Sequence, residues 1–183
     1  MAKKALINVD YTIDFVAENG ALTCGQPGQA IEQRITEITR EFISAGDFTV
    51  FAIDVHEKGD QFHPETKLFP PHNLRSTEGR ELYGSLKGVY EQIKDAEHVY
   101  YLDKTRYSAF AGTDLEIKLR ERGITEVHIV GVCTDICVLH TAVDAYNKGF
   151  QIVIYQDAVA SFNEMGHQWA LGHFENTLGA VIK

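Results

Sequence analysis

The sequence predicts a single α/β domain, residues 1–183, in which a mainly parallel sheet is flanked by helices to give a three-layer, Rossmann-like sandwich. Apolar segments of strand length alternate along the chain with segments of helical period. The strand segments are rich in valine and isoleucine, as expected for parallel strands that are buried on both faces. A length of 183 residues also fits one domain with a substantial core.

Short apolar runs are the candidate strands of this sheet. They occupy residues 3–9, 48–53, 98–102, 126–132, 151–155 and 177–182. In open parallel sheets, ligands bind at the carboxyl ends of the strands, where the strand order reverses. We therefore expect the functional residues to follow these runs.

Helical patterns fill most of the intervals between the candidate strands. Apolar residues at three-to-four spacing predict a helix over 28–46. A second helix is expected over 113–122, with Thr113 as its cap and Gly123 as its stop. Further helices are expected from the segment after Cys133 to about Lys148, and over residues 164–174.

The segment 57–85 interrupts this alternation. It is polar, contains Pro64, Pro70 and Pro71, and shows few helical signals. A long excursion inside a compact domain is usually functional. We therefore expect it to be a loop of the same domain that contributes to a metal site.

The composition excludes several partners. Lys plus Arg number 17 and Asp plus Glu number 26, so the net charge is −9, which disfavours binding to nucleic acid or to an anionic membrane. Three cysteines, an odd number, do not make a disulfide framework. The residues after Met1 lack the apolar stretch of a secretory signal. These features lead us to expect a cytoplasmic protein in a reducing compartment.

Side chains that can act as acids, bases, nucleophiles or metal ligands follow the ends of the apolar runs. Asp10, Asp54, His56, Lys104 and Cys137 each follow one of them. Taken singly, Asp10 is better explained as a turn residue or helix cap, and Lys104 is better explained as a solvated surface lysine. An acid, a cation and a thiol at one edge of a sheet are together better explained as an active site.

Cys137 is the candidate nucleophile. It lies where a buried strand gives way to a helix, and the helix start and a nearby cation are expected to lower the pKa of its thiol. A small buried apolar residue is the equally weighted alternative. Cys24 and Cys133 are interpreted as structural thiols, because no base accompanies them in the pattern.

Asp54 and His56 are the first candidate metal ligands. Side chains two residues apart in an extended segment point to one side, and a carboxylate with an imidazole suits zinc, manganese or iron. The loop that follows offers further donors. For Asp60 and His63 a solvated polar loop is the preferred interpretation, whereas for Glu65 and His72 spacing leaves ligation and solvation equally open.

Several motifs, taken in order, resemble those of the nicotinamidases, which belong to the isochorismatase-like cysteine hydrolases. They are Val9-Asp10 through Asp14-Phe15, Asp54-x-His56, Phe69-Pro70-Pro71-His72, Lys104 with Tyr107-Ser108-Ala109-Phe110, and Gly131-Val132-Cys133-Thr134-Asp135-Ile136-Cys137. The resemblance extends from the first strand to the helix after Cys137. It implies the isochorismatase-like fold, hydrolysis of nicotinamide to nicotinate and ammonia through a thioester, and a homo-oligomer.

The resemblance also implies a role for each matching position. The catalytic triad is Asp10, Lys104 and Cys137, and the amides of Cys133 and Cys137 form the oxyanion hole. One divalent ion, most simply zinc, is held by Asp54, His56 and His72, with Glu65 as a fourth ligand. The bond between Val132 and Cys133 is a cis peptide. The substrate ring is bound by Phe15, Phe69, Tyr107, Val132 and Cys133.

Two positions depart from the family pattern. Thr12-Ile13 replaces the more common Gln-Asn before Asp14, and Asn73 replaces a cysteine found after the histidine in many relatives. The first departure affects details of the pocket, and the second is expected to leave the mechanism unchanged. We also expect either Asp135 rather than Thr134 to cap the helix of Cys137 or water to satisfy this helix end, which keeps the amide of Cys137 free.

Other functions remain as alternatives. A different hydrolase of the same family, acting on another small amide or a vinyl ether, would not require a metal that binds the substrate ring. A non-catalytic metal-binding interaction domain would leave Asp10, Lys104 and Cys137 unexplained. A nucleotide-binding module is disfavoured, because no glycine-rich phosphate loop follows the first strand.

Overall fold

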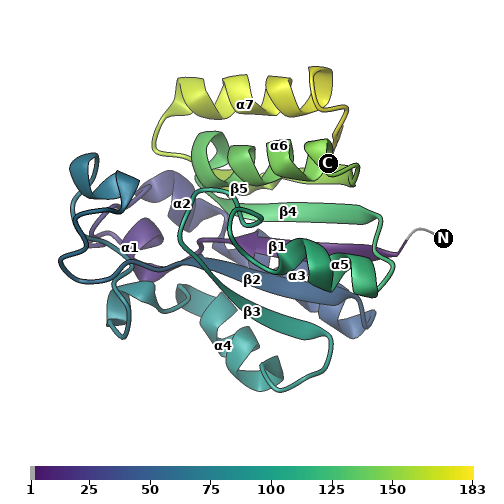
Figure 1. Cartoon of the computed structure of the whole chain (residues 1–183), viewed down its shortest axis with the longest axis horizontal. Helices are drawn as coiled ribbons and strands as arrows, with labels where there is room; N and C mark the ends of the chain where they lie inside the picture. The colour runs from purple at the N-terminus through teal and green to yellow at the C-terminus, as the bar shows by residue number, and fades with distance from the viewer. Residues whose placement is uncertain (1–2) are drawn as a thin grey trace.

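A computed structural model describes residues 3–183 of the chain as a central sheet between two layers of helices (Figure 1). Among these residues the sheet has six strands, in the order β3-β2-β1-β4-β5-β6, and every named strand pair is parallel. The strands are β1 (Lys4–Val9), β2 (Phe48–Asp54), β3 (Val99–Lys104), β4 (Glu126–Val132), β5 (Gln151–Ala160) and β6 (Val181–Ile182). The predicted three-layer α/β class is confirmed.

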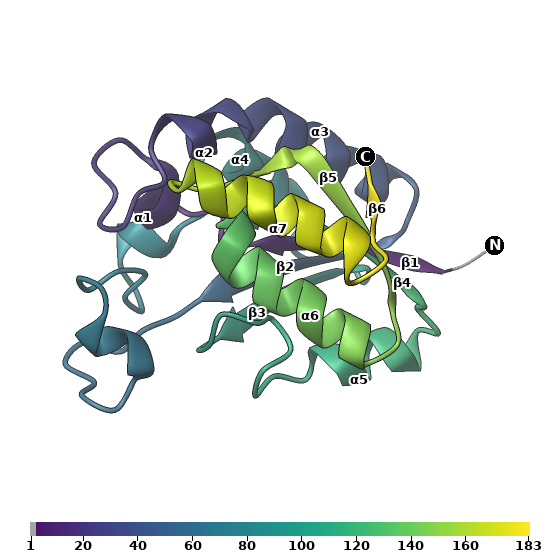
Figure 2. The same ribbon diagram turned by 90° about the horizontal axis from the view of Figure 1, so that it is seen from above.

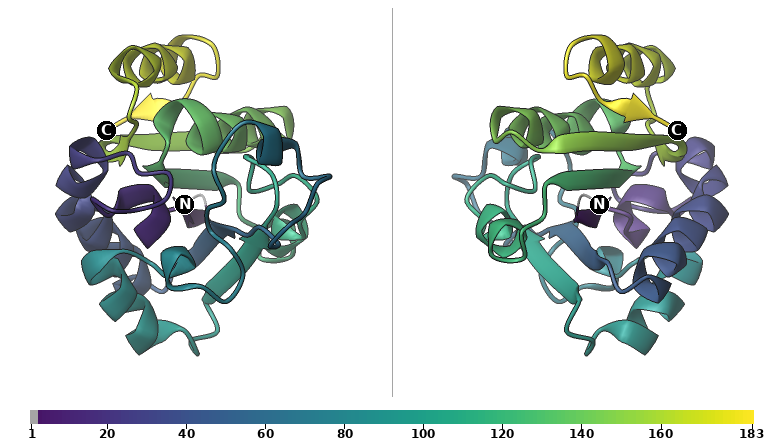
Figure 3. Two further views of the ribbon diagram at one scale, coloured as in Figure 1. Left: turned by 90° about the vertical axis from the view of Figure 1, so that its left-hand side faces the viewer. Right: turned by 90° about the vertical axis from the view of Figure 1, so that its right-hand side faces the viewer.

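The helices divide between the two faces of the sheet (Figure 3). They are α1 (Ile13–Val16), α2 (Gln26–Ala30), α3 (Glu32–Ser44), α4 (Gly84–Ile93), α5 (Leu115–Glu121), α6 (Leu139–Asn147) and α7 (Glu164–Asn176). A hydrophobic core lies on each face of the sheet, and the side chains of β1 point alternately into the two cores. Ala5 and Ile7 pack with residues of α5 to α7, whereas Leu6 packs with residues of α1, α3 and α4. The parallel sheet is therefore buried on both faces, as its composition predicts.

Several predicted boundaries are wrong. The expected strand 177–182 contains only the two residues of β6, because Leu178 to Ala180 form the turn after α7, with Gly179 at a φ of 64°. The expected helix 28–46 is two helices separated at Ile31, whose ψ of 0° is not helical. Strand β5 continues to Ala160, past a register irregularity opposite Ile129 to Gly131. Helix α4 was not anticipated.

The strand order reverses between β1 and β4. From β1 the chain goes outward to β2 and β3, and then returns to β4 on the other side of β1. Gly131, at a φ of 119°, allows close approach here, because a Cβ at this position would lie 2.0 Å from the carbonyl oxygen of Val9. The carboxyl ends of β1 and β4 are thus adjacent at the reversal, where a ligand site is expected.

The segment between β2 and α4, residues 55–83, extends beyond the carboxyl end of the sheet (Figure 2). It contains two 3₁₀ turns, Pro64–Lys67 and Glu78–Arg80. It is fastened by a parallel bridge between His56 and Leu74 and by an antiparallel bridge between Thr12 and Leu82. None of the helices formed by residues 3–183 has both the length and the apolar character needed to cross a bilayer.

Candidate active site

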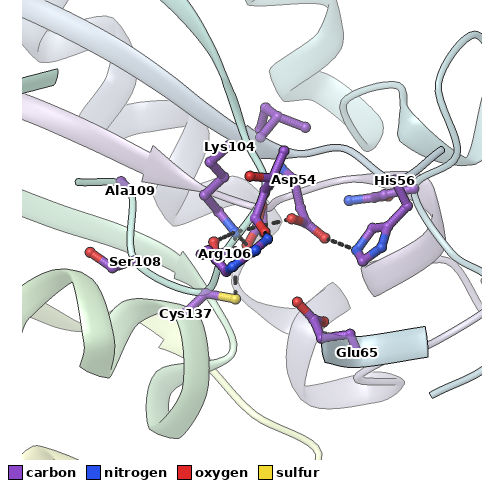
Figure 4. A network of polar contacts seen from close by, with 12 residues as sticks. Asp54, His56, Glu65, Lys104, Arg106, Ser108, Ala109 and Cys137 are labelled. Atoms are coloured by element: carbon purple, nitrogen blue, oxygen red, sulfur yellow. Dashed lines mark hydrogen bonds and ion pairs between the residues drawn. The ribbon is translucent and has the colours of Figure 1, made fainter. Parts of the chain in front are cut away.

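Three charged side chains meet at the carboxyl ends of neighbouring strands. Asp54 and Lys104 are the last residues of β2 and β3 and are paired in register. Asp10 follows β1, with a φ of 53°, and its Oδ1 accepts a hydrogen bond of 2.7 Å from the backbone N–H of Asp54. Figure 4 shows the lysine amino group between the Asp54 carboxylate and the sulfur of Cys137. Parallel pairing has thus brought together residues that are far apart in the sequence.

The Lys104 amino group is a fully buried cation with two carboxylate neighbours. Its Nζ lies 2.7 Å from Asp10 Oδ2 and 3.7 Å from Asp54 Oδ1, and it donates to the carbonyl of Arg106 at 3.1 Å. Burial alone would lower the pKa of Lys104, but the carboxylates, chiefly Asp10, raise it above its usual range. Lys104 therefore carries its charge at any ordinary pH.

The two carboxylates respond differently to the same lysine. Burial would raise the pKa of Asp54, but Lys104 and His56 outweigh burial and lower it to about 2. At Asp10, which is completely buried, desolvation is the larger effect and raises the pKa despite Lys104. Asp10 is thus the better proton acceptor of the pair, whereas Asp54 stays ionised and suits a cation.

The thiol of Cys137 lies at the same cluster. Its Sγ is 3.7 Å from Lys104 Nζ, and the residue is 8 % exposed. Burial raises the pKa of this thiol well above its usual range; Lys104 acts in the opposite direction, and Asp10 adds to the rise as a hydrogen-bond acceptor. The expected lowering of the thiol pKa is therefore wrong for the free protein. The thiol rests protonated beside a base.

The helix that carries Cys137 begins with a π-helical turn, Thr134–Val138, which continues into α6. The N–H groups of Ile136 and Val138 both donate to the carbonyl of Cys133, and no side chain caps this end. Asp135 is therefore not the cap, because it accepts instead from the hydroxyl of Ser161 at 2.7 Å; the alternative of an end without a side-chain cap is left.

The peptide bond between Val132 and Cys133 is cis, as the resemblance implies.

Thr134, the other residue considered as a cap, also has a different hydrogen-bond partner. Its hydroxyl pairs with a ring nitrogen of His167 at 2.8 Å. Neither side chain is therefore bound to the amide of Cys137.

The four predicted metal ligands form one buried group. Asp54, His56, Glu65 and His72 each offer a ligand atom, and these atoms all lie within 4.8 Å of one another. His56 Nε2 is 2.6 Å from Asp54 Oδ2, and His72 Nε2 is 3.7 Å from the same oxygen and 3.6 Å from Glu65 Oε2. Two carboxylates and two imidazoles make a donor set suited to zinc, manganese or iron.

The protonation pattern of His72 fits metal binding. Its Nδ1 pairs with the carbonyl of Pro70 at 2.8 Å, and since a carbonyl only accepts, Nδ1 carries the proton. In the neutral imidazole, Nε2 then presents a lone pair to the group. This atom and Asp54 Oδ1 are buried and, among the described residues, without a hydrogen-bond partner. Such atoms are costly unless a ligand satisfies them.

His63 corrects the sequence interpretation. It was expected to be solvated, but it is only 7 % exposed. Its Nδ1 accepts from the backbone N–H of Glu65 at 3.3 Å, and its Nε2 donates to the carbonyl of Thr105 at 2.7 Å. His63 thus caps the 3₁₀ turn of Glu65 and ties it to the residue after Lys104. A capping residue directly before Pro64 was the available signal.

Asp60, in contrast, behaves as a turn residue. It is half-buried, and its Oδ1 accepts from the backbone N–H groups of Phe62 and His63. It does not belong to the group of four ligands.

An apolar cavity adjoins the thiol and one of the four ligands, Glu65. The predicted ring-binding residues Phe15, Phe69, Tyr107, Val132 and Cys133 all line it, together with Cys137 and Glu65. The ring centroids of Phe15 and Phe69 are 5.2 and 6.2 Å from that of His72. Leu22, Ile136 and Phe162 also line the cavity and were not anticipated.

The two departures from the family pattern touch each other. The hydroxyl of Thr12 donates to Asn73 Oδ1 at 2.9 Å, and the backbone N–H of Asn73 donates to Asp14 Oδ2 at 2.8 Å. Because Asn73 follows His72 directly, these bonds hold the histidine loop against the chain after β1. Asn73 therefore contributes to positioning, which its spacing alone did not indicate.

Comparisons with known proteins agree with this geometry. The isochorismatase domain model matches residues 4–183. A Bacillus subtilis protein named as the uncharacterized isochorismatase family protein PncA is 64% identical over 180 residues, covering 98% of both chains.

Two solved structures extend the comparison. The crystal structure of nicotinamidase/pyrazinamidase PncA from Bacillus subtilis has a TM-score of 0.98 and 67% identity, covering 98% of each chain. The pyrazinamidase of Pyrococcus horikoshii in complex with zinc has a TM-score of 0.85 and 30% identity, covering 99% of this chain and 98% of that one. The chain therefore belongs to the isochorismatase family.

Proposed function

We propose that this chain is a metal-dependent cysteine amidohydrolase that converts nicotinamide to nicotinate and ammonia. One observation carries the proposal: Cys137, whose thiol belongs to a buried cluster with Lys104 and Asp10, and Glu65, a member of the four-residue ligand group, line the same aromatic-walled cavity. The similarity to a Bacillus subtilis structure described as a nicotinamidase/pyrazinamidase supports the same substrate class.

The first half of the reaction forms a thioester. Asp10 accepts the proton of the Cys137 thiol as the sulfur attacks the carboxamide carbon. The N–H groups of Cys133 and Cys137 receive the developing oxyanion, and Lys104 stabilises the negative charge shared between Asp10 and the sulfur. When the C–N bond breaks, Asp10 returns the proton to the leaving nitrogen, and ammonia departs.

The second half hydrolyses the thioester. A water molecule attacks the acyl carbon while Asp10 accepts one of its protons. The C–S bond then breaks, nicotinate leaves, and the proton returns to the sulfur of Cys137. The raised pKa of Asp10 suits this alternation between base and acid, because its carboxylate accepts a proton more readily than an ordinary carboxylate does.

The ligand group and the aromatic residues orient the substrate in this proposal. Phe15, Phe69 and Tyr107 enclose the pyridine ring, and Asp54, His56, Glu65 and His72 hold one divalent ion, zinc in the simplest case and manganese or iron otherwise. When bound, that ion would supply a Lewis acid that could orient the ring nitrogen and lower the pKa of water. The zinc in the pyrazinamidase from Pyrococcus horikoshii supports zinc.

A coupled assay of ammonia release from nicotinamide tests the function. The purified protein should release ammonia, lose activity with a chelator, and regain it when zinc, manganese or iron is returned. Ammonia release that a chelator does not affect would remove the metal from the proposal. A chain that binds zinc but leaves nicotinamide intact would favour the interaction-domain alternative. The homo-oligomeric state and the cytoplasmic location remain predictions.

A further inference from the structure

Two sulfur atoms that belong neither to the catalytic triad nor to the metal ligands form a pair beside the cavity. Cys24 Sγ and Cys133 Sγ are 3.0 Å apart, although the two residues are 109 positions apart in the sequence. Both side chains are buried, Cys24 at 3 % and Cys133 at 7 % exposure. The amidase mechanism uses the backbone N–H of Cys133 but neither of these two sulfurs.

We propose that Cys24 and Cys133 are a redox-active pair that a hydroperoxide converts to an intramolecular disulfide. A disulfide needs an S–S separation of about 2.05 Å, so the two sulfurs must approach by about 1 Å. Cys133 directly follows β4 and is held by the sheet. Cys24 belongs to the irregular segment 17–25 between α1 and α2, and its backbone N–H donates to the carbonyl of Phe15 at 2.8 Å, so the approach requires rotation of its side chain or a small shift of this segment.

The cavity gives a small oxidant access to one member of the pair. Cys133 lines the same cavity as Cys137, whereas Cys24 contacts Cys133 and is not among the lining residues. In the first step the thiolate of Cys133 attacks a peroxide oxygen, the O–O bond breaks, and a sulfenic acid and hydroxide form. In the second step Cys24 attacks that sulfur, the S–O bond breaks, and water leaves. Two thiols and one hydrogen peroxide thus give one disulfide and two waters.

The environment of the pair sets its resting state. The contact with Cys24, together with burial, raises the pKa of the Cys133 thiol well above its usual range. Since the thiolate is the reactive form, the pair stays reduced at neutral pH and oxidises faster as the pH rises. In a reducing compartment the bond would be transient, which is typical of regulatory rather than structural disulfides.

The bond would connect two walls of the cavity. Segment 17–25 carries Leu22, and the loop after β4 leads directly to Cys137; both residues line the cavity. The cross-link would also close a loop of more than a hundred residues in the unfolded chain, which favours the folded state. The oxidised protein is therefore expected to unfold at a higher denaturant concentration than the reduced protein.

The test uses the Cys137→Ala variant, so that only the proposed pair remains. After treatment with hydrogen peroxide at pH 8.5, its intact mass should fall by two hydrogen atoms. Trypsin without reductant should then release peptide 5–34, which contains Cys24, joined to peptide 123–148, which contains Cys133. Dithiothreitol should separate them. Addition of oxygen atoms without the linked peptides would overturn the proposal.

A second variant controls for position and folding. Cys24→Ser in the Cys137→Ala background should gain oxygen at Cys133 and give no linked peptide, with Cys24→Ala tested alongside. Cys24→Ser in the otherwise unchanged chain should keep its basal rate of ammonia release, because this sulfur touches no reacting atom. The mass readout does not depend on the proposed amidase function, so the two proposals can fail separately.

Discussion

Two histidines of this chain are equally buried, each 2 % exposed, and yet their surroundings are opposite. His128, in β4, has both ring nitrogens bonded, Nδ1 to the hydroxyl of Tyr155 at 3.0 Å and Nε2 to Glu126 at 2.8 Å. His72, in the loop after β2, has Nδ1 bonded to a carbonyl and Nε2 unpartnered among the described residues. Burial alone therefore does not distinguish a structural histidine from a ligand.

The pKa values of the two histidines differ in the same way. Burial lowers the pKa of His128, and Glu126 only partly opposes it. Burial also acts to lower the pKa of His72, but Glu65, the carbonyl of Pro70 and Asp54 outweigh it and raise the pKa. Two carboxylates next to a buried imidazole favour a positive charge at that position, from a proton or a metal ion. A neutral imidazole with both nitrogens hydrogen-bonded has a structural role. At His72 the unsatisfied ring nitrogen lies beside two carboxylates, and this combination distinguishes it from His128.

The largest expected effect is on the turnover rate, and it separates catalysis from metal binding in the site that contains His72. Cys137→Ala should lower kcat by roughly 10⁴–10⁶-fold, because Cys137 is the thiol that contacts both Lys104 and Asp10. Zinc content, measured by atomic emission after dialysis, should stay at the wild-type value. Retained turnover in this variant would show that Cys137 is not the nucleophile.

The next effect concerns Lys104, the cation that compensates the buried negative charges of Asp10 and Asp54. Lys104→Met keeps most of the side-chain volume but leaves Asp10 and Asp54 buried without their counter-charge, so the free energy of unfolding should fall by about 3–5 kcal/mol. Urea unfolding of the chelator-treated protein measures it. Lys94→Met, which removes an exposed lysine paired with Glu91, is the matched control and should match the wild type. Equal stability of all three proteins would contradict the argument.

A smaller effect tests whether a fully bonded histidine can still serve the site. His63 resembles His128 in having partners on both nitrogens, but one of them is the N–H of the ligand Glu65. His63→Ala should therefore weaken zinc affinity by roughly 10–100-fold, as expected for a residue that orients a ligand. Competition with a chromophoric chelator gives the affinity. His128→Ala, in the same titration, should bind zinc like the wild type, and a similar loss in both variants would erase the distinction.

The smallest expected effect is a pH dependence of the free energy of unfolding that arises from His128. Because the folded state lowers the pKa of His128, the unfolded chain binds the proton more readily below about pH 6.5. The contribution of His128 to stability is thus present above that pH and is lost as the pH falls through it, by at most about 1.4 kcal/mol per pH unit. Urea unfolding from pH 8 to 5, compared with His128→Gln, isolates this contribution. A wild-type advantage that grew on acidification would reverse the sign.

The residues at the strand ends could be predicted from the sequence, because a strand fixes where its last side chain lies. Asp10, Asp54 and Lys104 follow apolar runs, and parallel pairing brings the ends of such runs together whatever the exact register. The motif resemblance assigned Glu65 and His72, which spacing alone left open. Helix α4 and the two-residue β6 were missed or misplaced, since their boundaries depend on packing rather than on local pattern.

What could not be predicted depends on contacts between distant segments. The solvated interpretation of His63 failed because its partner Thr105 lies in another loop, 42 residues away. The thiol pKa of Cys137 was expected to fall, since a sequence shows the neighbouring cation but not how completely the folded chain removes water. The contact between Thr12 and Asn73 was likewise invisible until the loop after β2 was placed against the chain after β1.

The reversal of strand order between β1 and β4 also has a consequence for how activity arises during synthesis. Asp10, Lys104 and Cys137 come from the beginning, the middle and the last third of the chain, so no fragment that ends before β4 contains the set. A growing polypeptide emerging from the ribosome would order its first three strands well before the nucleophile is available. Hydrolytic competence is therefore a late product of biogenesis, and ribosome-bound intermediates of this protein are expected to be inert.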